Sequence, residues 1–379
     1  MRHPFAQSTT QPLAALLLCG VLLPLTCSAQ DKPATQPEVV VTSPDSLVHL
    51  GSIDSFDTTE EGIKAGKLLL KSLETGDPAP ALEAAAIYKE LIPKENFGGE
   101  YSALQWFCDL LKASPQEKET MLKDPLAKEF YAFLGDNKYE LLKEFLSRKY
   151  RLEKFGDENT FDAVRRESFL QDYVLFNNPR RESWERTTEM LEALKIAPGQ
   201  TIADVGCGPG YFTFKFLDRV GEKGKIVAVD INETHVKYLD DYLQKRGIKN
   251  VSVAKSELDD IGVKEKVDMV WLCSLYHIMY VLASEKELDG FIGSIKRSLK
   301  PGGRFVIVDN ALVKDKTLPY HGPFIAKELI IGQLAHYGFK LQETFQVIPQ
   351  RYMLVFTDEH QPQSGPPSPQ STQSPNKKP

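Results

Sequence analysis

Three alternating glycines follow a short apolar segment in the middle of the chain. Residues 201–213 read Thr-Ile-Ala-Asp-Val-Gly-Cys-Gly-Pro-Gly-Tyr-Phe-Thr, with glycine at 206, 208 and 210. A strand that enters such a turn lets backbone N–H groups approach a ligand without intervening Cβ atoms. A dinucleotide site favours G-x-G-x-x-G, whereas Gly206, Gly208 and Gly210 form G-x-G-x-G. The pattern predicts a ligand-binding turn, although such turns after strands also occur for structural reasons alone.

A carboxylate ends the next apolar segment. Residues 226–230 read Ile-Val-Ala-Val-Asp and end about twenty residues beyond the glycines. A carboxylate at this place can accept hydrogen bonds from ribose hydroxyls. An NAD site would also have an acid here. Asp230 therefore predicts nucleoside binding without choosing the cofactor.

Another apolar segment, further along the chain, leads to a group of reactive residue types. Residues 267–272 are followed by Cys273, Ser274, Leu275, Tyr276 and His277. His277 is the candidate base, because imidazole titrates near neutral pH, and Tyr276 beside it is the second candidate catalytic residue. The alternative is that His277 only forms a hydrogen bond to the backbone or to a cofactor. Cys273 could act as a nucleophile in principle, but its place at the end of an apolar strand favours a small buried residue.

The elements that must position these residues alternate between strand and helix. This order predicts an α/β fold with a mostly parallel sheet of seven strands and an antiparallel hairpin at one edge. We expect strands at 201–205, 225–229, 250–254, 267–272, 303–308, 339–347 and 351–357. Helices are expected at 232–245, 284–299 and 321–337.

In this order the segments resemble the Rossmann-like class I S-adenosylmethionine-dependent methyltransferases, over about half of the chain. Asp204 before the glycines and the Leu-Lys-Pro-Gly-Gly-Arg run at 299–304 belong to the same pattern. The sequence is most similar to exported bacterial members, which share Pro-Arg-Arg at 179–181 with Trp184, Tyr-His at 276–277 and a final strand at 352–356.

The resemblance implies S-adenosylmethionine as cofactor. It implies that the turn holds the amino-acid end of the cofactor and that Asp230 holds both ribose hydroxyls. Glu257 falls where the family has the acid of a Gly-Asp pair that contacts adenine, but Ser256 replaces the glycine, so Asp259 is an alternative. The cofactor-binding residues expected from it are Asp204, Gly206, Gly208, Gly210, Asp230, Glu257 and Cys273.

Methyl transfer from a sulfonium is an in-line displacement that depends mainly on positioning, and it needs a base only when the acceptor carries a proton. The family's Asn/Asp-Pro-Pro-Tyr/Phe tetrad for planar nitrogen is absent at 273–276, which argues against DNA adenine methylation. We expect a methyltransferase for a small molecule or an envelope protein. The alternative is a non-catalytic exported scaffold that keeps the fold.

The N-terminus has the features of an export signal. An apolar run at 13–25 follows Arg2 and His3, and small residues precede a cleavage point after Ala29. We therefore expect residues 1–29 to be a signal peptide and the protein to be exported to the periplasm or cell envelope. Lipid attachment at Cys27 and an uncleaved apolar N-terminus are alternatives. No other membrane contact is expected.

The rest of the chain divides by composition. Residues 30–46 are predicted to be a linker, 47–155 a helical accessory domain, 156–358 the methyltransferase domain, and 359–379 a disordered tail. Prolines at 78, 93, 115 and 125 divide the helical region into short helices. A helical-repeat scaffold that binds another protein is an alternative interpretation of that region.

Charge and cysteine content exclude some functions. The net charge of −6 gives no attraction for phosphate backbones, so no nucleic-acid partner is expected. Beyond the signal, the cysteines at 108, 207 and 273 are odd in number and lack metal-like spacing, so neither disulfides nor a metal are predicted. The basic residues between 148 and 181 are interspersed with acids, which favours a solvated, salt-bridged helix face over an anion-binding patch.

Overall fold

A computed structural model of the chain describes residues 48–49, 59–93, 98–123, 139–157, 160–311 and 324–359. The predicted signal peptide and linker, and the predicted tail beyond residue 359, lie outside these residues. Within the described ranges, no helix has both the length and the apolar character needed to cross a bilayer.

The region before the sheet is helical, as expected. The helices are α1 (Glu60–Thr75), α2 (Pro78–Leu91), α3 (Gly98–Lys112), α4 (Pro115–Met121), α6 (Glu140–Lys149), α7 (Phe161–Gln171), the π-helix η2 (Asp172–Phe176), α8 (Arg181–Glu185) and α9 (Thr187–Ala193). Proline begins α2 and α4, where its missing N–H costs nothing, after the N-caps Asp77 and Ser114. These prolines punctuate the helices in the way the sequence indicates.

The helical core extends beyond the predicted boundary at 155/156. Leu69, Leu104 and Leu142 from the first helices are fully buried together with Phe169 and Tyr173 from α7 and η2. The last helices before α8 therefore pack with the preceding helices.

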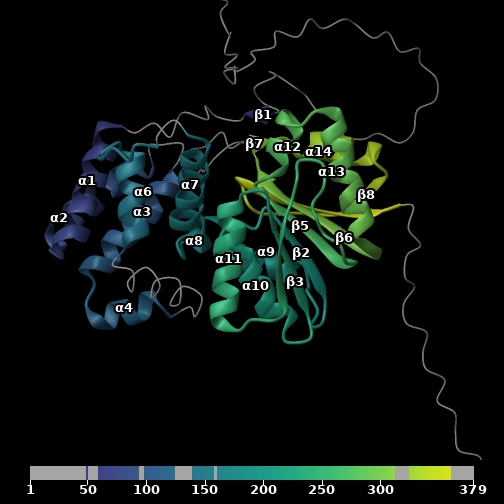
Figure 1. Ribbon diagram of the computed structural model, residues 1–379, viewed down its shortest axis with the longest axis horizontal. Helices are drawn as coiled ribbons and strands as arrows, with labels where there is room; N and C mark the ends of the chain where they lie inside the picture. The colour runs from purple at the N-terminus through teal and green to yellow at the C-terminus, as the bar shows by residue number, and fades with distance from the viewer. Residues whose placement is uncertain are drawn as a thin grey trace, which may run out of the picture. The chain divides into compact units, whose positions relative to one another are not determined.

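Seven strands form the central sheet (Figure 1). They are β2 (Thr201–Val205), β3 (Lys225–Asp230), β4 (Val251–Lys255), β5 (Val267–Cys273), β6 (Leu299–Asn310), β8 (Phe339–Ile348) and β9 (Arg351–Asp358). The order is β4-β3-β2-β5-β6-β9-β8, parallel from β4 to β6, with β9 antiparallel to both β6 and β8. This confirms the predicted α/β Rossmann-like sheet with an antiparallel hairpin at one edge.

Helices cover both faces of the sheet. One apolar core joins the sheet to α9, α10 (Tyr211–Val220) and α11 (Glu233–Arg246). The other joins it to α12 (Tyr276–Leu282), α13 (Glu285–Ser298) and α14 (Lys327–His336). Consecutive strand residues such as Ile202 and Ala203 belong to opposite cores, because successive side chains in a strand point to opposite faces.

Some boundaries differ from the expected ones. The structure has a helix, α12, that was not among the expected ones. The strand expected at 303–308 begins at Leu299, so the Leu-Lys-Pro-Gly-Gly-Arg run at 299–304 is part of it. The helix expected at 321–337 begins only at Lys327, because Phe324–Ile325 form strand β7, which pairs antiparallel with β1 (Val48–His49). Residues 321–323 lie outside the described residues.

Candidate functional site

The candidate site lies where the order of the strands reverses. From β2 the chain fills one side of the sheet with β3 and β4 and then returns to the other side with β5 and β6. Open α/β sheets bind ligands at such a switch point, outside the carboxyl ends of the strands. The predicted residues lie at or just after the carboxyl ends of β2, β3, β4 and β5. Asp230 and Cys273 are the last residues of β3 and β5, and only Asp204 lies inside a strand, β2.

The three glycines of the turn have different surroundings. All have positive φ, with values of 76° at Gly206, 52° at Gly208 and 100° at Gly210. A Cβ at Gly210 would lie 2.8 Å from Phe214, and one at Gly206 would lie 3.1 Å from Leu275. No other atom comes within 4 Å of the corresponding position at Gly208. Packing therefore requires glycine at 206 and 210, while Gly208 borders open space that a ligand can approach.

Backbone hydrogen bonds tie the turn to the end of β3. The N–H groups of Gly206 and Cys207 donate to the carbonyl of Val229, at 2.8 and 2.9 Å. Gly208 N–H donates to Asp230 Oδ2, and Asn232 N–H donates to Asp230 Oδ1, both at 2.8 Å. A carboxylate has about four acceptor positions, so these two donors fix Asp230 and leave it able to accept further hydrogen bonds.

Asp204 lies within the protein, bonded to the first helix after the turn. Thr213 Oγ1 donates to Asp204 Oδ2 at 2.6 Å, and the carboxyl group is buried. Burial raises its pKa to about 7; the charge of Asp230 adds to this effect, while the Thr213 hydrogen bond and Arg181 oppose it. Asp204 joins β2 to α10, and its contact with a cofactor stays a prediction.

The adenine-side candidates follow β4. Glu257 is exposed, and its carboxylate lies 3.9 Å from Lys255 Nζ, which pairs more closely with Glu233 at 2.6 Å. Ser256 N–H donates to the carbonyl of Asp230 at 3.0 Å, which places the Ser256–Glu257 pair next to the ribose-side acid. The alternative acid, Asp259, packs beside Gly290 of α13.

His277 has a partner that the sequence interpretation missed. Its Nδ1 lies 2.8 Å from Asp309 Oδ1, and its backbone N–H donates to Asp309 Oδ2 at 3.1 Å. Asp309 is fully buried near the carboxyl end of β6, and the His277 ring is 4% exposed. The carboxylate fixes the orientation of the ring and leaves Nε2 as the nitrogen for proton transfer. An acid at the end of the next parallel strand is the signal that could have identified it.

Tyr276 is placed differently from its neighbour. It is fully buried, and its hydroxyl donates to Gln333 Oε1 of α14 at 2.7 Å. Burial raises the pKa of this hydroxyl well above its ordinary value. Tyr276 is part of the core beneath α14, and this geometry gives no support to its predicted catalytic role.

Cys273 contacts a buried charged cluster. Arg351 Nη2 lies 3.0 Å from Cys273 Sγ and 3.0 Å from Ser274 Oγ. Arg181 Nη2 lies 3.7 Å from the same sulfur. Burial raises the pKa of the thiol, against the effect of the two arginines. Cys273 is half-buried rather than fully buried, and its raised pKa disfavours the thiolate that a nucleophile needs; its contact with the cofactor stays a prediction.

Glu185 joins the two arginines of this cluster. Its side chain is fully buried, 2.8 Å from Arg181 Nε and 3.4 Å from Arg351 Nη1. Arg351 Nη1 also donates to Asn310 Oδ1 at 2.8 Å. The cluster joins α8 to the ends of β5, β6 and β9. Except for Arg181 and Cys273, its members did not stand out in the sequence.

The expected basic helix face is only partly solvated. Arg148 is buried and pairs with Glu144 at 2.9 Å and Asp157 at 3.0 Å. Arg181 is buried as well. The expected salt bridges are present, but for these two residues the expected exposure is wrong, because each guanidinium has carboxylate partners that compensate for the loss of water.

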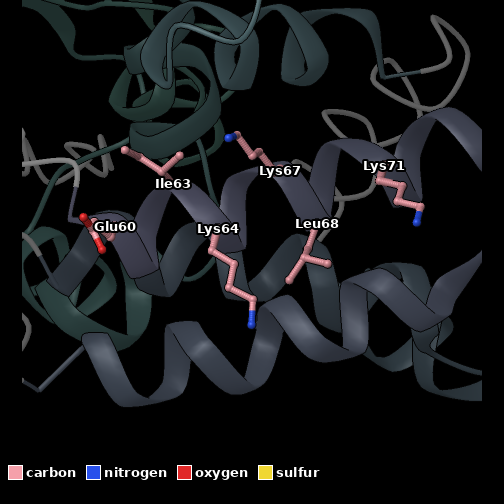
Figure 2. A pocket seen from close by; sticks show the side chains of 6 residues that line it. All are labelled: Glu60, Ile63, Lys64, Lys67, Leu68 and Lys71. Atoms are coloured by element: carbon pink, nitrogen blue, oxygen red, sulfur yellow. The ribbon is translucent and has the colours of Figure 1, made fainter.

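A separate hollow lies on α1, away from the strand ends (Figure 2). It is lined by Glu60, Ile63, Lys64, Lys67, Leu68 and Lys71, all from the same helix. Lys64 forms an ion pair with Glu83 at 3.0 Å. Its charged side chains all come from one helix and include no buried pair like His277 and Asp309, so the strand ends are the better candidate site.

Comparison with known proteins supports the same region. Residues 196–345 match the family described as "Methyltransferase domain". Ubiquinone/menaquinone biosynthesis C-methyltransferases are similar: that of Shewanella sp. (strain ANA-3) is 30% identical over 159 residues, 38% of this chain and 60% of that protein. That of Shewanella oneidensis is 29% identical over the same length. The chain thus spans about three-fifths of the length of these relatives.

Solved structures with some similarity include two methyltransferases. A SAM-dependent methyltransferase from Aquifex aeolicus aligns with a TM-score of 0.41 and 24% identity, over 48% of this chain and 94% of that one. A glycopeptide N-methyltransferase complexed with S-adenosylmethionine aligns with a TM-score of 0.37 and 13% identity, over 45% of this chain and 86% of that one. Residues 196–345 thus resemble a methyltransferase domain, in agreement with the Rossmann-like sheet that they form.

Proposed function

We propose that this protein transfers a methyl group from S-adenosylmethionine to an acceptor that gives up a proton to His277. The observation that carries the proposal is the pairing of His277 with Asp309 at the sheet edge that also carries the open glycine turn. Leu275, two residues before His277, borders Gly206, so the end of β5 adjoins the turn.

The residues at the turn fit this cofactor. Gly208 leaves a space that a Cβ would occupy, and the backbone around it suits the amino-acid end of the cofactor. Asp230 is fixed at the end of β3 with acceptor capacity left for ribose hydroxyls. When bound, S-adenosylmethionine supplies a methyl group on a positively charged sulfur, which is ready for in-line displacement.

His277 and Asp309 are suited to removing a proton from the acceptor. Asp309 holds Nδ1, so that Nε2 can accept the proton, and its carboxylate stabilises the imidazolium that forms. Both side chains are buried, which keeps water from competing with the acceptor. A base in this position is needed for hydroxyl or carbon acceptors, which carry a proton at neutral pH.

The names of the relatives suggest the acceptor atom. They are C-methyltransferases, and a carbon acceptor must exchange a proton for the methyl group. We therefore propose a small molecule with an acidic carbon or hydroxyl group as the acceptor. Export, as predicted from residues 1–29, would place this acceptor in the cell envelope, where an envelope protein is the second candidate.

Labelling with methyl-tritiated S-adenosylmethionine tests the proposal. Cell-envelope extracts are incubated with the wild-type protein, His277→Gln or Asp309→Asn, and binding of the cofactor is measured by calorimetry in parallel. We expect label transfer by the wild type and a loss of about 100-fold in His277→Gln, with unchanged cofactor binding. Labelling by His277→Gln at the wild-type rate would rule out its role as a base. No cofactor binding by the wild type would favour the scaffold alternative.

A further inference from the structure

His235 lies between two carboxylates that belong to different parts of the fold. Its Nδ1 is 3.2 Å from Asp230 Oδ1, and its Nε2 is 3.2 Å from Asp172 Oδ2. Asp230 ends β3 beside the glycine turn, and Asp172 begins the π-helix η2. The His235 side chain is 3% exposed. One buried imidazole thus joins the candidate ribose acceptor to the helical region.

The two ion-pair distances favour a charged ring. A neutral imidazole has one N–H, so one of its nitrogens would direct a lone pair at a carboxylate, whereas imidazolium offers a donor to each side. Burial alone would lower the pKa of His235, but Asp172 and Asp230 outweigh this effect and raise it to about 10. At neutral pH the ring therefore carries a positive charge.

The other charged groups nearby have partners of their own. Arg165 lies 3.7 Å from Glu233 at the start of α11, and Arg166 pairs with Glu144 while its guanidinium lies over the Phe169 ring. Asp204 interacts electrostatically with Asp230 and is not among the groups that shift the pKa of His235. Asp172 and Asp230 are thus the charged groups that set the charge of the ring.

Further contacts place η2 and α7 against the same turn. Asn177, after the end of η2, donates through Nδ2 to the carbonyl of Pro209 at 3.3 Å. Asn232 donates through Nδ2 to the carbonyl of Arg165 in α7, also at 3.3 Å. The helical region therefore contacts the turn at Pro209 and the segment after β3 at Asn232 and His235. π-helical segments often occur at functional sites.

We propose that His235, as an imidazolium between Asp172 and Asp230, is a positioning residue that fixes the Asp230 carboxylate for the cofactor and holds η2 against the glycine turn. This inference rests on the proposed function, since it assigns Asp230 to S-adenosylmethionine. It gives the helical region a role in cofactor binding. With His235 neutral or absent, Asp230 loses a charged partner beside its two backbone donors, and η2 loses its ionic contact.

The first test follows the charge of the ring in the ligand-free protein. Nitrogen-15 NMR of labelled histidine is recorded from pH 6 to 9, and the His235 signal is assigned by its absence in His235→Gln. We expect an imidazolium throughout this range in the wild type. In Asp172→Asn one carboxylate is lost, so the pKa falls and deprotonation begins within the range. Titration near pH 6.5 in the wild type would overturn the proposal.

The second test measures S-adenosylmethionine binding by calorimetry over the same pH range. Relative to the wild type at the same pH, we expect at least about tenfold weaker binding by His235→Gln at every pH, and in Asp172→Asn a deficit that grows about tenfold between pH 6 and 9. His336→Gln, an exposed histidine on α14, should match the wild type. Wild-type affinity in His235→Gln would overturn the positioning role.

The two tests separate this inference from the proposed function. If the wild-type protein binds no S-adenosylmethionine, the proposed function fails, and with it the role of His235 toward the cofactor. The NMR titration needs no ligand, so it still decides whether the imidazolium joins Asp172 to Asp230.

Discussion

The two sides of the candidate site are built in different ways. On the cofactor side, Gly206, Gly208 and Asp230 lie close together in sequence and are held mainly by backbone hydrogen bonds. On the acceptor side, His277 pairs with Asp309, and Asn310 next to it joins a buried cluster that draws Glu185 and Arg351 from opposite ends of the domain. Local sequence can therefore specify the first side, whereas only the complete fold assembles the second.

This difference has an energetic consequence. Buried ions must regain through their partners the free energy that they lose on leaving water, so removal of one partner is strongly destabilising. The acceptor side depends on such ions at Glu185, Arg181 and Arg351. We expect substitutions there to affect folding first, and substitutions on the cofactor side to affect ligand binding first.

The largest effect is expected from Glu185→Gln. It leaves Arg181 and Arg351 buried without their shared carboxylate, which should lower the free energy of unfolding by about 3–5 kcal/mol. Denaturant unfolding measures this change. The control is Glu189→Gln, which removes an exposed pair with Arg186 and should cost at most about 1 kcal/mol. Equal losses in the two variants would contradict the distinction between the sides.

Two glycine substitutions on the cofactor side separate an effect on stability from an effect on ligand binding. Gly210→Ala brings a Cβ to 2.8 Å from Phe214 at a φ of 100°, and should destabilise the fold by about 2 kcal/mol. Gly208→Ala meets open space at a φ of 52°, and should cost only about 1 kcal/mol while weakening S-adenosylmethionine binding at least about tenfold. Thermal unfolding and calorimetry distinguish the two, and unchanged affinity in Gly208→Ala would exclude that space as the binding site.

The smallest effect concerns the buried acid of the cofactor side. The pKa of Asp204 rises from 3.8 to about 7 on folding, so its contribution to stability is fully present below pH 3.8 and is lost as pH rises through 7. Asp204→Asn mimics the protonated form. Relative to the wild type, the variant should therefore gain stability between pH 6 and 8, by on the order of 1 kcal/mol. Unfolding curves that differ by the same amount at both pH values would contradict the raised pKa.

The sequence was sufficient for most of the sheet. Each predicted strand has its counterpart, because alternating and apolar runs separated by turns are local signals. Residues 276–282 did not stand out as a helix, since Tyr-His-Ile-Met-Tyr-Val-Leu has almost no polar face to set a period. The short strand β7 pairs with β1 from the far end of the chain, and no local pattern specifies such a contact.

The site was predictable only where its residues belong to consecutive elements of one recognisable motif. The glycine turn and Asp230 form one local motif, whereas Asp309, Glu185 and Arg351 become visible only when β6, α8 and β9 meet. Tyr276 was grouped with His277 because the two are adjacent. Successive residues on a helix point in directions about 100° apart, so one faces α14 and the other faces Asp309.

The proposed function requires that the glycine turn and Asp230 together bind S-adenosylmethionine. Calorimetry with S-adenosylmethionine and with NAD, on the wild-type protein, Asp230→Asn and the control Asp241→Asn, an exposed acid of α11, is the decisive test. We predict that the wild type and the control bind S-adenosylmethionine with a Kd below about 1 mM and do not bind NAD, and that binding is lost in Asp230→Asn. Binding of NAD instead, or unchanged affinity in Asp230→Asn, would contradict the assignment of the glycine turn and Asp230 to S-adenosylmethionine.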